Sequence, residues 1–315
     1  MTAANTPAPA HPAVGAPTDI AARSGDARRR GEGHVLTLDC PESPGIVHAV
    51  SRFVVEQGCD ILDNQQFGDR RAGHFFMRLH LVPGGSGPAP ATDALRRDFT
   101  AVAALFGMRW RLEPAGVRRR VLVMASRYGH CLNDLLFRSR SGDLPADVVA
   151  VVSNHRDHEA LADWYGVPHF HIPVTAATRG SAEEQLLRLV EEFDVDLVVL
   201  ARYMQILSAE LCTRLAGRAI NIHHSFLPGF KGAKPYHQAY EYGVKVVGAT
   251  AHYVTADLDE GPIIAQEVTP VDHTHTPEDL VALGRDTESA ALVKAVRRHC
   301  EGRVVVHGRR TVVLH

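Results

Sequence analysis

Hydrophobic and polar positions along the chain follow two different rhythms. Between His34 and about residue 112, short β-rich segments such as HVLTLDC and HFFMRLHLV predict four strands. Two segments with apolar residues at helical spacing predict helices between them, and Ile46, Val50 and Phe53 would form the buried face of the first. The resulting order, βαββαβ, is typical of a ferredoxin-like α+β domain.

The second rhythm begins after residue 114, where the apolar runs become continuous. VLVMAS, ADVVAVVSN and VDLVVLAR read as buried strands that alternate with helical segments such as HCLNDLLFR and SAEEQLLRLVEEF. Such alternation favours right-handed βαβ units and a parallel sheet covered on both faces. KVVGATAHYVT and GPIIAQEVTPV then predict longer strands, Pro277–Cys300 a long helix, and RVVVHGRRTVVL a terminal hairpin around Gly308.

These patterns divide the chain into three segments. Residues 1–32 are rich in Ala, Pro, Thr and Gly, and we expect a disordered tail because such a segment buries too little apolar surface to offset its ordering entropy. Residues 33–114 form the first predicted domain and residues 115–315 the second.

The composition excludes several classes of protein. With 45 % hydrophobic and 22 % charged residues, the chain has the make-up of a globular protein, not of a disordered or fibrous one. A net charge of −2 provides no basic field for nucleic acid or an anionic membrane, so neither is an expected partner. No apolar run approaches the about 18 residues of a membrane span. The five Cys are widely spaced without a C-x-x-C, which favours free thiols in the cytoplasm.

Several common catalytic motifs are also missing. The turn after the first strand of the second domain, SRYGH, has one glycine, and neither G-x-G-x-x-G nor a Walker G-x-x-x-x-G-K occurs. Without those glycines the backbone cannot approach a pyrophosphate closely. G-x-S-x-G and H-E-x-x-H are absent as well, which argues against the common esterases and metalloproteases.

The chemistry is concentrated in AINIHHSFLPGFKGAKP and GATAHYVTADLDEGPIIAQE. Asn221 and His223 fall at the end of a buried strand, where open α/β sheets bind ligands. Alternation places both on one face of that strand, with Ile222 and His224 on the other. An amide donor and an imidazole on one face suit a carbonyl substrate, since one stabilises an oxyanion and the other handles a proton. Asp259, in the turn LDEGP, could orient the imidazole or a water molecule.

The residues alone leave alternatives open. An Asn-x-His pair also occurs without catalysis, Asp259 could be a solvated turn residue, and His224 is more typical of a core histidine with its hydrogen bonds satisfied. His273 and His275 could bind a metal, but no third ligand lies nearby in the sequence, so we expect no metal site.

A family resemblance adds to this interpretation. INIHHSFLPGFKGAKPYHQAYEYGVKVVGATAHYVTADLDEGPII resembles the signature of the folate-dependent formyltransferase fold, and ARYMQILS resembles its folate-binding strand end. Together with GHCLNDLLFR, VVSNHRDH and LDCPESPGIVHAVSRFVVEQGCDI, the chain from about residue 34 to 315 is similar to the formyltetrahydrofolate deformylases. The resemblance implies an ACT-like regulatory domain at 33–114 and a Rossmann-like formyltransferase domain with a mostly parallel sheet at 115–315.

The resemblance also implies roles for particular residues. Asn221, His223 and Asp259 map onto the family's catalytic triad. The residues expected to bind folate are Arg202, Met204, Gln205, Ile206, Leu207, Val254 and Asp257. In the first domain, Asp39, Ser43 and Gly45 resemble the turn where ACT domains bind an amino-acid effector. SRYGH departs from the glycine- and serine-rich loop that holds the substrate phosphate in the related transferases, which favours water as the formyl acceptor.

The activity implied is hydrolysis of 10-formyltetrahydrofolate to formate and tetrahydrofolate, which balances one-carbon pools and supplies formate for purine synthesis. No metal or organic cofactor is expected, and a homo-oligomer is. Two alternatives remain at this point: a formyltransferase that passes the group to an amine acceptor, and a non-catalytic sensor of folate and amino acid.

Overall fold

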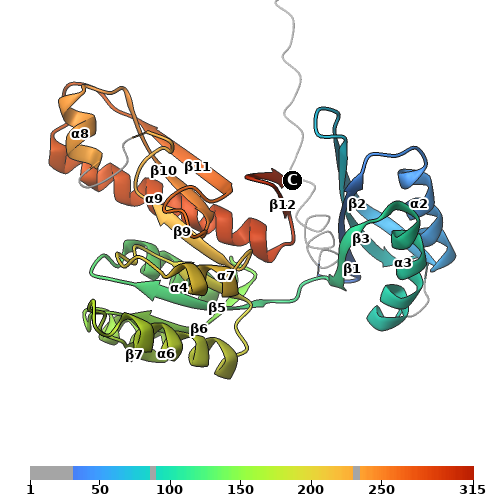
Figure 1. Ribbon diagram of the computed structural model, residues 1–315, viewed down its shortest axis with the longest axis horizontal. Helices are drawn as coiled ribbons and strands as arrows, with labels where there is room; N and C mark the ends of the chain where they lie inside the picture. Colours follow the sequence, from blue (N-terminus) through green and yellow to red (C-terminus); the bar gives the residue numbers. More distant parts are fainter. Residues whose placement is uncertain (1–30, 86–89, 230–234) are drawn as a thin grey trace, which may run out of the picture.

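The structure, a computed structural model, describes residues 31–85, 90–229 and 235–315. Residues 1–30 of the predicted tail and residues 230–234 of the long signature lie outside these ranges. Within them, the chain forms two sheet-based domains side by side, joined by one extended connection (Figure 1). Of the described helices, none is long and apolar enough to cross a membrane.

The first domain is an antiparallel sheet covered by helices on one face (Figure 1). Its elements are β1 (His34–Pro41), α2 (Ile46–Glu56), β2 (Cys59–Asp69), β3 (His74–Pro83), α3 (Thr92–Phe106) and β4 (Arg109–Pro114). The strands lie in the order β2-β3-β1-β4. Leu38, Ile46 and Phe99 belong to one buried cluster between sheet and helices. This is the ferredoxin-like plan that the sequence predicts.

The second domain is built around a larger, mostly parallel sheet. Its elements are β5 (Arg119–Ala125), α4 (His130–Ser141), β6 (Ala146–Ser153), α5 (Glu159–Tyr165), β7 (His169–His171), α6 (Arg179–Glu192), β8 (Leu197–Leu200), α7 (Ala209–Arg214), β9 (Ala219–His223), α8 (Pro235–Glu241), β10 (Val246–Tyr253), β11 (Ile263–Pro270), α9 (Pro277–Cys300), β12 (Val304–His307) and β13 (Arg310–Val313). The sheet order is β11-β10-β9-β8-β5-β6-β7. The strands from β9 to β7 are parallel, whereas β10 and β11 run antiparallel to their neighbours. The predicted α/β class is therefore confirmed.

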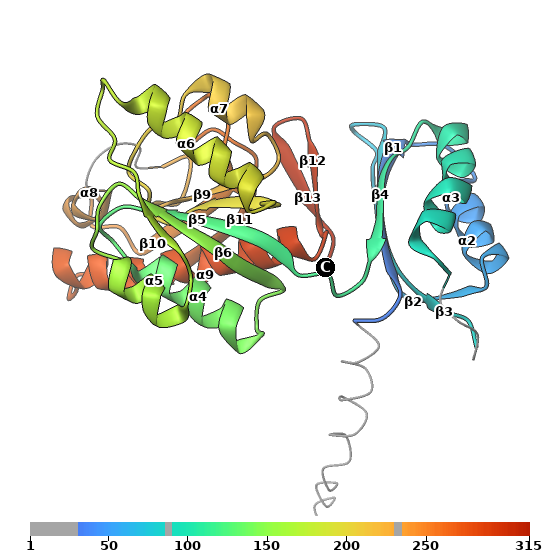
Figure 2. The same cartoon turned by 90° about the horizontal axis from the view of Figure 1, so that it is seen from below.

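Helices cover both faces of this sheet (Figure 2). α4, α5 and α9 pack on one face, in a buried cluster that includes Leu132, Val199 and Leu292. α6 and α7 pack on the other face through Leu186 and Leu211. Because both faces are buried, the central parallel strands are mostly apolar, and Asn221 and His223 lie near the carboxyl end of β9, where a ligand can bind.

The hairpin β12–β13 lies between the two domains (Figure 2). The Thr37 hydroxyl of β1 donates to the Gly302 carbonyl at 3.0 Å. The rings of His74 in β3 and His307 in β12 lie 4.5 Å apart. The first domain therefore rests against the end of the second domain that carries α9 and the hairpin.

Two short helices, α7 and α8, were not predicted. They have six and seven residues, too few for the periodicity of a helix to stand out in the sequence. α7 is specified by a local signal instead, since the Ser208 side chain accepts a hydrogen bond from the Leu211 amide as an N-cap.

Candidate active site

The predicted catalytic and folate-binding residues line one cavity of about 360 Å³ at the carboxyl ends of β8 and β9. Its walls are the segment after β8, the end of β9 and the segment after β10. The predicted residues that line it are Arg202, Met204, Gln205, Ile206, Leu207, Asn221, His223, Val254, Asp257 and Asp259. Positions distant along the chain are thus brought to one place by the sheet, as expected for the ligand site of an open α/β sheet.

His223 and Asp259 form the polar centre of the cavity. His223 Nδ1 lies 3.1 Å from Asp259 Oδ2, and both side chains are largely buried. His223 Nε2 is also buried and has no hydrogen-bond partner among the described residues. A carboxylate that holds Nδ1 leaves Nε2 to exchange a proton with a bound substrate, which is the arrangement a general acid–base needs.

A second histidine, His252 of β10, completes the centre. In the antiparallel register of β9 and β10, His252 lies opposite Asn221. The Asn221 amide nitrogen is 3.3 Å from His252 Nε2, and His252 Nδ1 is 2.9 Å from the Tyr253 carbonyl. The carbonyl can only accept, so Nδ1 carries a proton. Nε2 faces both the Asn221 amide and Asp259 Oδ1, the latter at 3.7 Å. His252 therefore holds the Asn221 amide in place, and an N–H of that amide is left to donate to a substrate.

Asp259 is held in a demanding backbone conformation. Its φ of +56° is left-handed, which is uncommon for a residue other than glycine. Two residues later, a Cβ on Gly261 would lie 1.7 Å from the Tyr253 carbonyl oxygen, so only glycine fits. The loop therefore turns sharply against the end of β10, and this turn points the Asp259 carboxylate at His223.

The charge of Asp259 follows from its neighbours. Burial acts to raise the pKa of the carboxyl, but hydrogen bonds from His223 and His252 outweigh it and hold the pKa well below the usual range. Asp259 is therefore a carboxylate throughout the neutral range.

The segment after β8 is fixed at both ends. The Met204 amide donates to the Ser126 hydroxyl at 2.9 Å, and the Ser208 amide donates to Glu183 at 2.7 Å. Between these anchors, the side chains of Met204 and Ile206 remain more than half exposed. A cavity that has exposed apolar side chains on one wall and polar groups on another is suited to a flat aromatic ligand with polar edges.

Arg202 and His224 differ from expectation. Arg202 lines the cavity, but its guanidinium forms an ion pair with Glu288 of α9 at 3.3 Å and lies over the Tyr128 ring. It therefore points away from the folate-binding segment. His224 is only partly buried and lines the same cavity, so it is not the core histidine that the sequence favoured. Burial, followed by the charge of Arg202, lowers the pKa of His224 to about 4.

The three expected effector residues have different surroundings. Leu38 and Cys40 face the helices, so the intervening Asp39 faces the opposite side of the sheet. There its carboxylate accepts hydrogen bonds from His74 at 2.7 Å and from Arg109 at 2.6 Å. Ser43 and Gly45 lie in the turn before α2, and Gly45 has a left-handed φ of +93°. The carboxylate of Asp39 is thus already paired on the side away from that turn.

Comparison with known proteins supports a family assignment. The model of the formyl transferase family matches residues 119–296. A formyltetrahydrofolate deformylase of Corynebacterium sp. (strain P-1) is 58 % identical over 89 % of this chain and 98 % of its own length.

Solved structures agree. The formyltetrahydrofolate deformylase of Burkholderia mallei superimposes with a TM-score of 0.86 at 49 % identity, over 90 % of this chain and 100 % of that one. A glycinamide ribonucleotide transformylase of Symbiobacterium toebii gives 0.60 at 36 % identity, over 64 % of this chain and 96 % of that one. The full-length matches are thus to deformylases, and the chain belongs to the formyltetrahydrofolate deformylase family.

Proposed function

We propose that this chain hydrolyses 10-formyltetrahydrofolate to formate and tetrahydrofolate, and that Asn221, His223 and Asp259 carry out the reaction. The observation that carries the assignment of residues is the contact of His223 with Asp259 at 3.1 Å, next to Asn221, in the cavity that the folate-binding segments line. Membership of the deformylase family supports the reaction itself.

In this mechanism the formyl carbon lies beside Asn221 and His223. Water attacks that carbon while the free N–H of the Asn221 amide donates to the developing oxyanion. A preorganised donor of this kind typically contributes about 3–4 kcal/mol. The C–N bond to the folate then breaks, and the folate nitrogen regains a proton. With the substrate bound in this way, the reaction uses water and side chains of the chain itself.

The proton path follows from the state of Asp259. From the sequence, Asp259 is expected to position the water and take up its proton. A carboxyl group whose pKa is held so low is a weak base, however. We therefore assign proton uptake to His223 Nε2, with Asp259 orienting the ring through Nδ1 and stabilising the imidazolium that forms. The same Nε2 then donates its proton to the leaving nitrogen.

The decisive experiment is incubation with 10-formyltetrahydrofolate in buffer without an amine acceptor. A deformylase releases one formate for each tetrahydrofolate formed. A formyltransferase would consume substrate only after an amine is added, and a sensor would bind without turnover; either result would overturn the proposal.

For the first domain we propose an ACT-type regulatory role. An amino-acid effector would place its carboxylate at the turn Ser43–Gly45, where the first amides of α2 are free to donate. The paired Asp39 would contribute only if His74 or Arg109 released it. Calorimetry and rate measurements with a panel including glycine and methionine test this; no heat and no change of rate would restrict the domain to self-association.

We also propose that the chain assembles into a homo-oligomer and works in the cytoplasm. β2 is an edge strand of the first sheet, and edge strands favour pairing between copies. All five cysteines are free and buried, as in proteins of a reducing compartment. Sedimentation at several concentrations distinguishes an oligomer from a monomer.

A further inference from the structure

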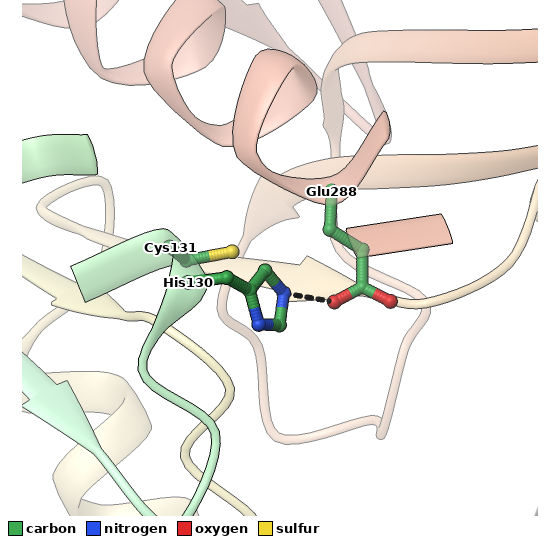
Figure 3. Close-up of side chains that lie close together, drawn as sticks. All are labelled: His130, Cys131 and Glu288. Atoms are coloured by element: carbon green, nitrogen blue, oxygen red, sulfur yellow. Dashed lines mark hydrogen bonds and ion pairs between the residues drawn. The ribbon is translucent and has the colours of Figure 1, made fainter. Parts of the chain in front are cut away.

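A buried charge cluster borders the cavity at Arg202 and has no role in the mechanism above. Its centre is Glu288 of α9, whose side chain is 2 % exposed. Glu288 Oε1 accepts from the Tyr236 hydroxyl at 2.8 Å, and Oε2 accepts from His130 Nε2 at 2.7 Å. Arg202 Nε lies 3.3 Å from the same Oε2. Figure 3 shows the His130 ring, at the start of α4, facing the Glu288 carboxylate of α9.

Two features of the sequence accommodate this cluster. Gly284 lies one turn before Glu288 on the same face of α9, and a Cβ there would lie 2.1 Å from the Tyr236 ring. Glycine in a helix interior costs about 1 kcal/mol relative to alanine, yet only glycine leaves room for this ring. Arg202 has a left-handed φ of +62°, which is a further cost for a residue with a side chain.

Burial of these charged groups also costs free energy. Arg202 is nine-tenths buried, and its Nε and Nη1 have no hydrogen-bond partner among the described residues. Burial acts to raise the pKa of Glu288, but His130 and the charge of Arg202 outweigh it, so Glu288 is a buried carboxylate. Apolar side chains of similar volume would be as stable or more stable in such a place. Stability therefore does not explain the cluster.

A metal site is the first alternative, because His130, Cys131 and Glu288 each place a ligand atom within 4.8 Å of the others (Figure 3). The surroundings disfavour it. Burial, together with the charge of Glu288, raises the pKa of the Cys131 thiol, so the cluster as it stands holds a neutral thiol. Arg202 already supplies a cation at Glu288. The charges in this cluster are therefore balanced without a metal ion.

The position of the cluster suggests its use. Arg202 and His224 line the catalytic cavity, whereas Tyr236, His130 and Glu288 lie behind them. The His224 ring lies 5.1 Å from that of His223 and 6.4 Å from that of Tyr236, so it connects the two groups. Arg202 thus brings the cluster to the wall of the cavity, and His224 lies between Tyr236 and the catalytic imidazole.

We propose that Arg202, Glu288, His130 and Tyr236 form a barrier that keeps amines away from the formyl carbon, so that water alone accepts the formyl group. The catalytic fold is shared with a transformylase, so the fold itself does not exclude an acceptor. Arg202 and His224 form this part of the wall, and their side chains leave less room for a nucleophile larger than water. This inference rests on the proposed hydrolysis.

The test measures how the formyl group divides between water and an added amine. Purified protein is given 10-formyltetrahydrofolate with and without glycinamide, and formate and N-formylglycinamide are both quantified. When the amine reacts, its nitrogen bonds to the formyl carbon, the bond to the folate nitrogen breaks, and the proton lost by the amine passes to the folate. The wild-type protein should yield formate alone. Its formate release without amine tests the proposed hydrolysis separately.

The main variant is Arg202→Gly, because glycine adopts the left-handed φ of this position without strain and the change opens the barrier. We expect the ratio of formylated amine to formate to rise at least about tenfold, the scale on which a single steric contact discriminates substrates. The ratio is informative even if the total rate falls. Asp194→Gly is the matched control: Asp194 also has a left-handed φ, of +47°, but does not line the cavity. It should leave the ratio unchanged.

A second variant keeps the test informative if the Arg202→Gly protein does not fold. Gly284→Ala displaces the Tyr236 ring together with its hydroxyl, while the side chains of Arg202, Glu288 and His130 are unchanged. It too should raise the ratio. If folded Arg202→Gly and Gly284→Ala proteins hydrolyse the substrate but form no N-formylglycinamide, the barrier is refuted. A cobalt titration that gives a thiolate charge-transfer band, lost in Cys131→Ser, would also overturn it in favour of a metal site.

Discussion

Replacement of Asp259 by asparagine separates catalysis from folding more cleanly than any other single change in this site. The two side chains have nearly the same shape. Asparagine is also among the residues that best tolerate a left-handed backbone, so the φ of +56° is retained without added strain. We therefore expect the variant to fold as the wild type does and to bind folate with affinity within a few-fold.

The loss of turnover can be estimated from the contact with His223. When His223 takes up a proton, unit charges 3.1 Å apart attract by about 5 kcal/mol at an effective dielectric constant of about 20. The asparagine dipole retains part of this, which leaves a loss of about 3–5 kcal/mol. At about 1.4 kcal/mol for each tenfold change, kcat should fall by about 10²–10⁴. The amide can also donate to Nδ1, which would leave His223 in the wrong tautomer.

The assay is formate release without an acceptor, with folate affinity measured separately by calorimetry. Glu260→Gln is the matched control, since it removes the next carboxylate along the chain, which pairs with Arg309 at 3.0 Å outside the cavity. That variant should keep near-normal turnover. An Asp259→Asn protein with kcat within tenfold of the wild type would refute the charge argument and the assignment of Asp259.

Four further outcomes are expected. His223→Ala should lower turnover by about two decades or more with folate affinity intact, because the loss of a general acid–base typically costs about 10²–10⁴; unchanged kcat would exclude His223. Asn221→Ala should be the milder lesion of the two in the same assay, since the imidazole can still reach the oxyanion. The pKa of His224 is lowered to about 4, so only the unfolded chain binds that proton between pH 6.5 and 4. Urea unfolding should accordingly show stability falling by up to about 3 kcal/mol on acidification through this window, and less in His224→Gln. Dialysis against EDTA should leave formate release unchanged; a loss restored by zinc would point to a metallohydrolase.

Elements with strong local signals could be predicted from the sequence. α9 occupies Pro277–Cys300 as expected, because Thr276 and Asp279 form a capping box in front of a proline at the first turn. The strands of both domains could be predicted because each apolar segment is long enough to indicate a strand without information from its neighbours. The proposed catalytic residues could be singled out because they lie in one extended motif with a buried strand and a glycine-containing turn, and the structure brings them to one cavity.

Features that depend on strand register or on distant contacts could not be predicted. His252 contacts Asn221 only because β9 and β10 are antiparallel in a particular register, and the segment GATAHYVT carries no sign of that register. Asp39 pairs with Arg109, which lies 70 residues later in the chain. A carboxylate that was expected to bind an effector therefore already has a partner within the domain. Arg202 and Glu288 belong to different segments of the second domain, and nothing local marks them as partners.

The strained residues of the described chain show how the scaffold and the chemistry are connected. Three residues other than glycine have a left-handed φ there, and two of them, Arg202 and Asp259, line the catalytic cavity. Each conformation costs on the order of 1–2 kcal/mol, which a sheet buried on both faces can offset. At Asp259 the conformation aims a carboxylate at the catalytic histidine. At Arg202 it turns a guanidinium from the folate cavity into the cluster around Glu288. The two costs thus correspond to the two requirements of a hydrolase on a transferase fold: a group that polarises the catalytic imidazole, and a structure that leaves water as the acceptor.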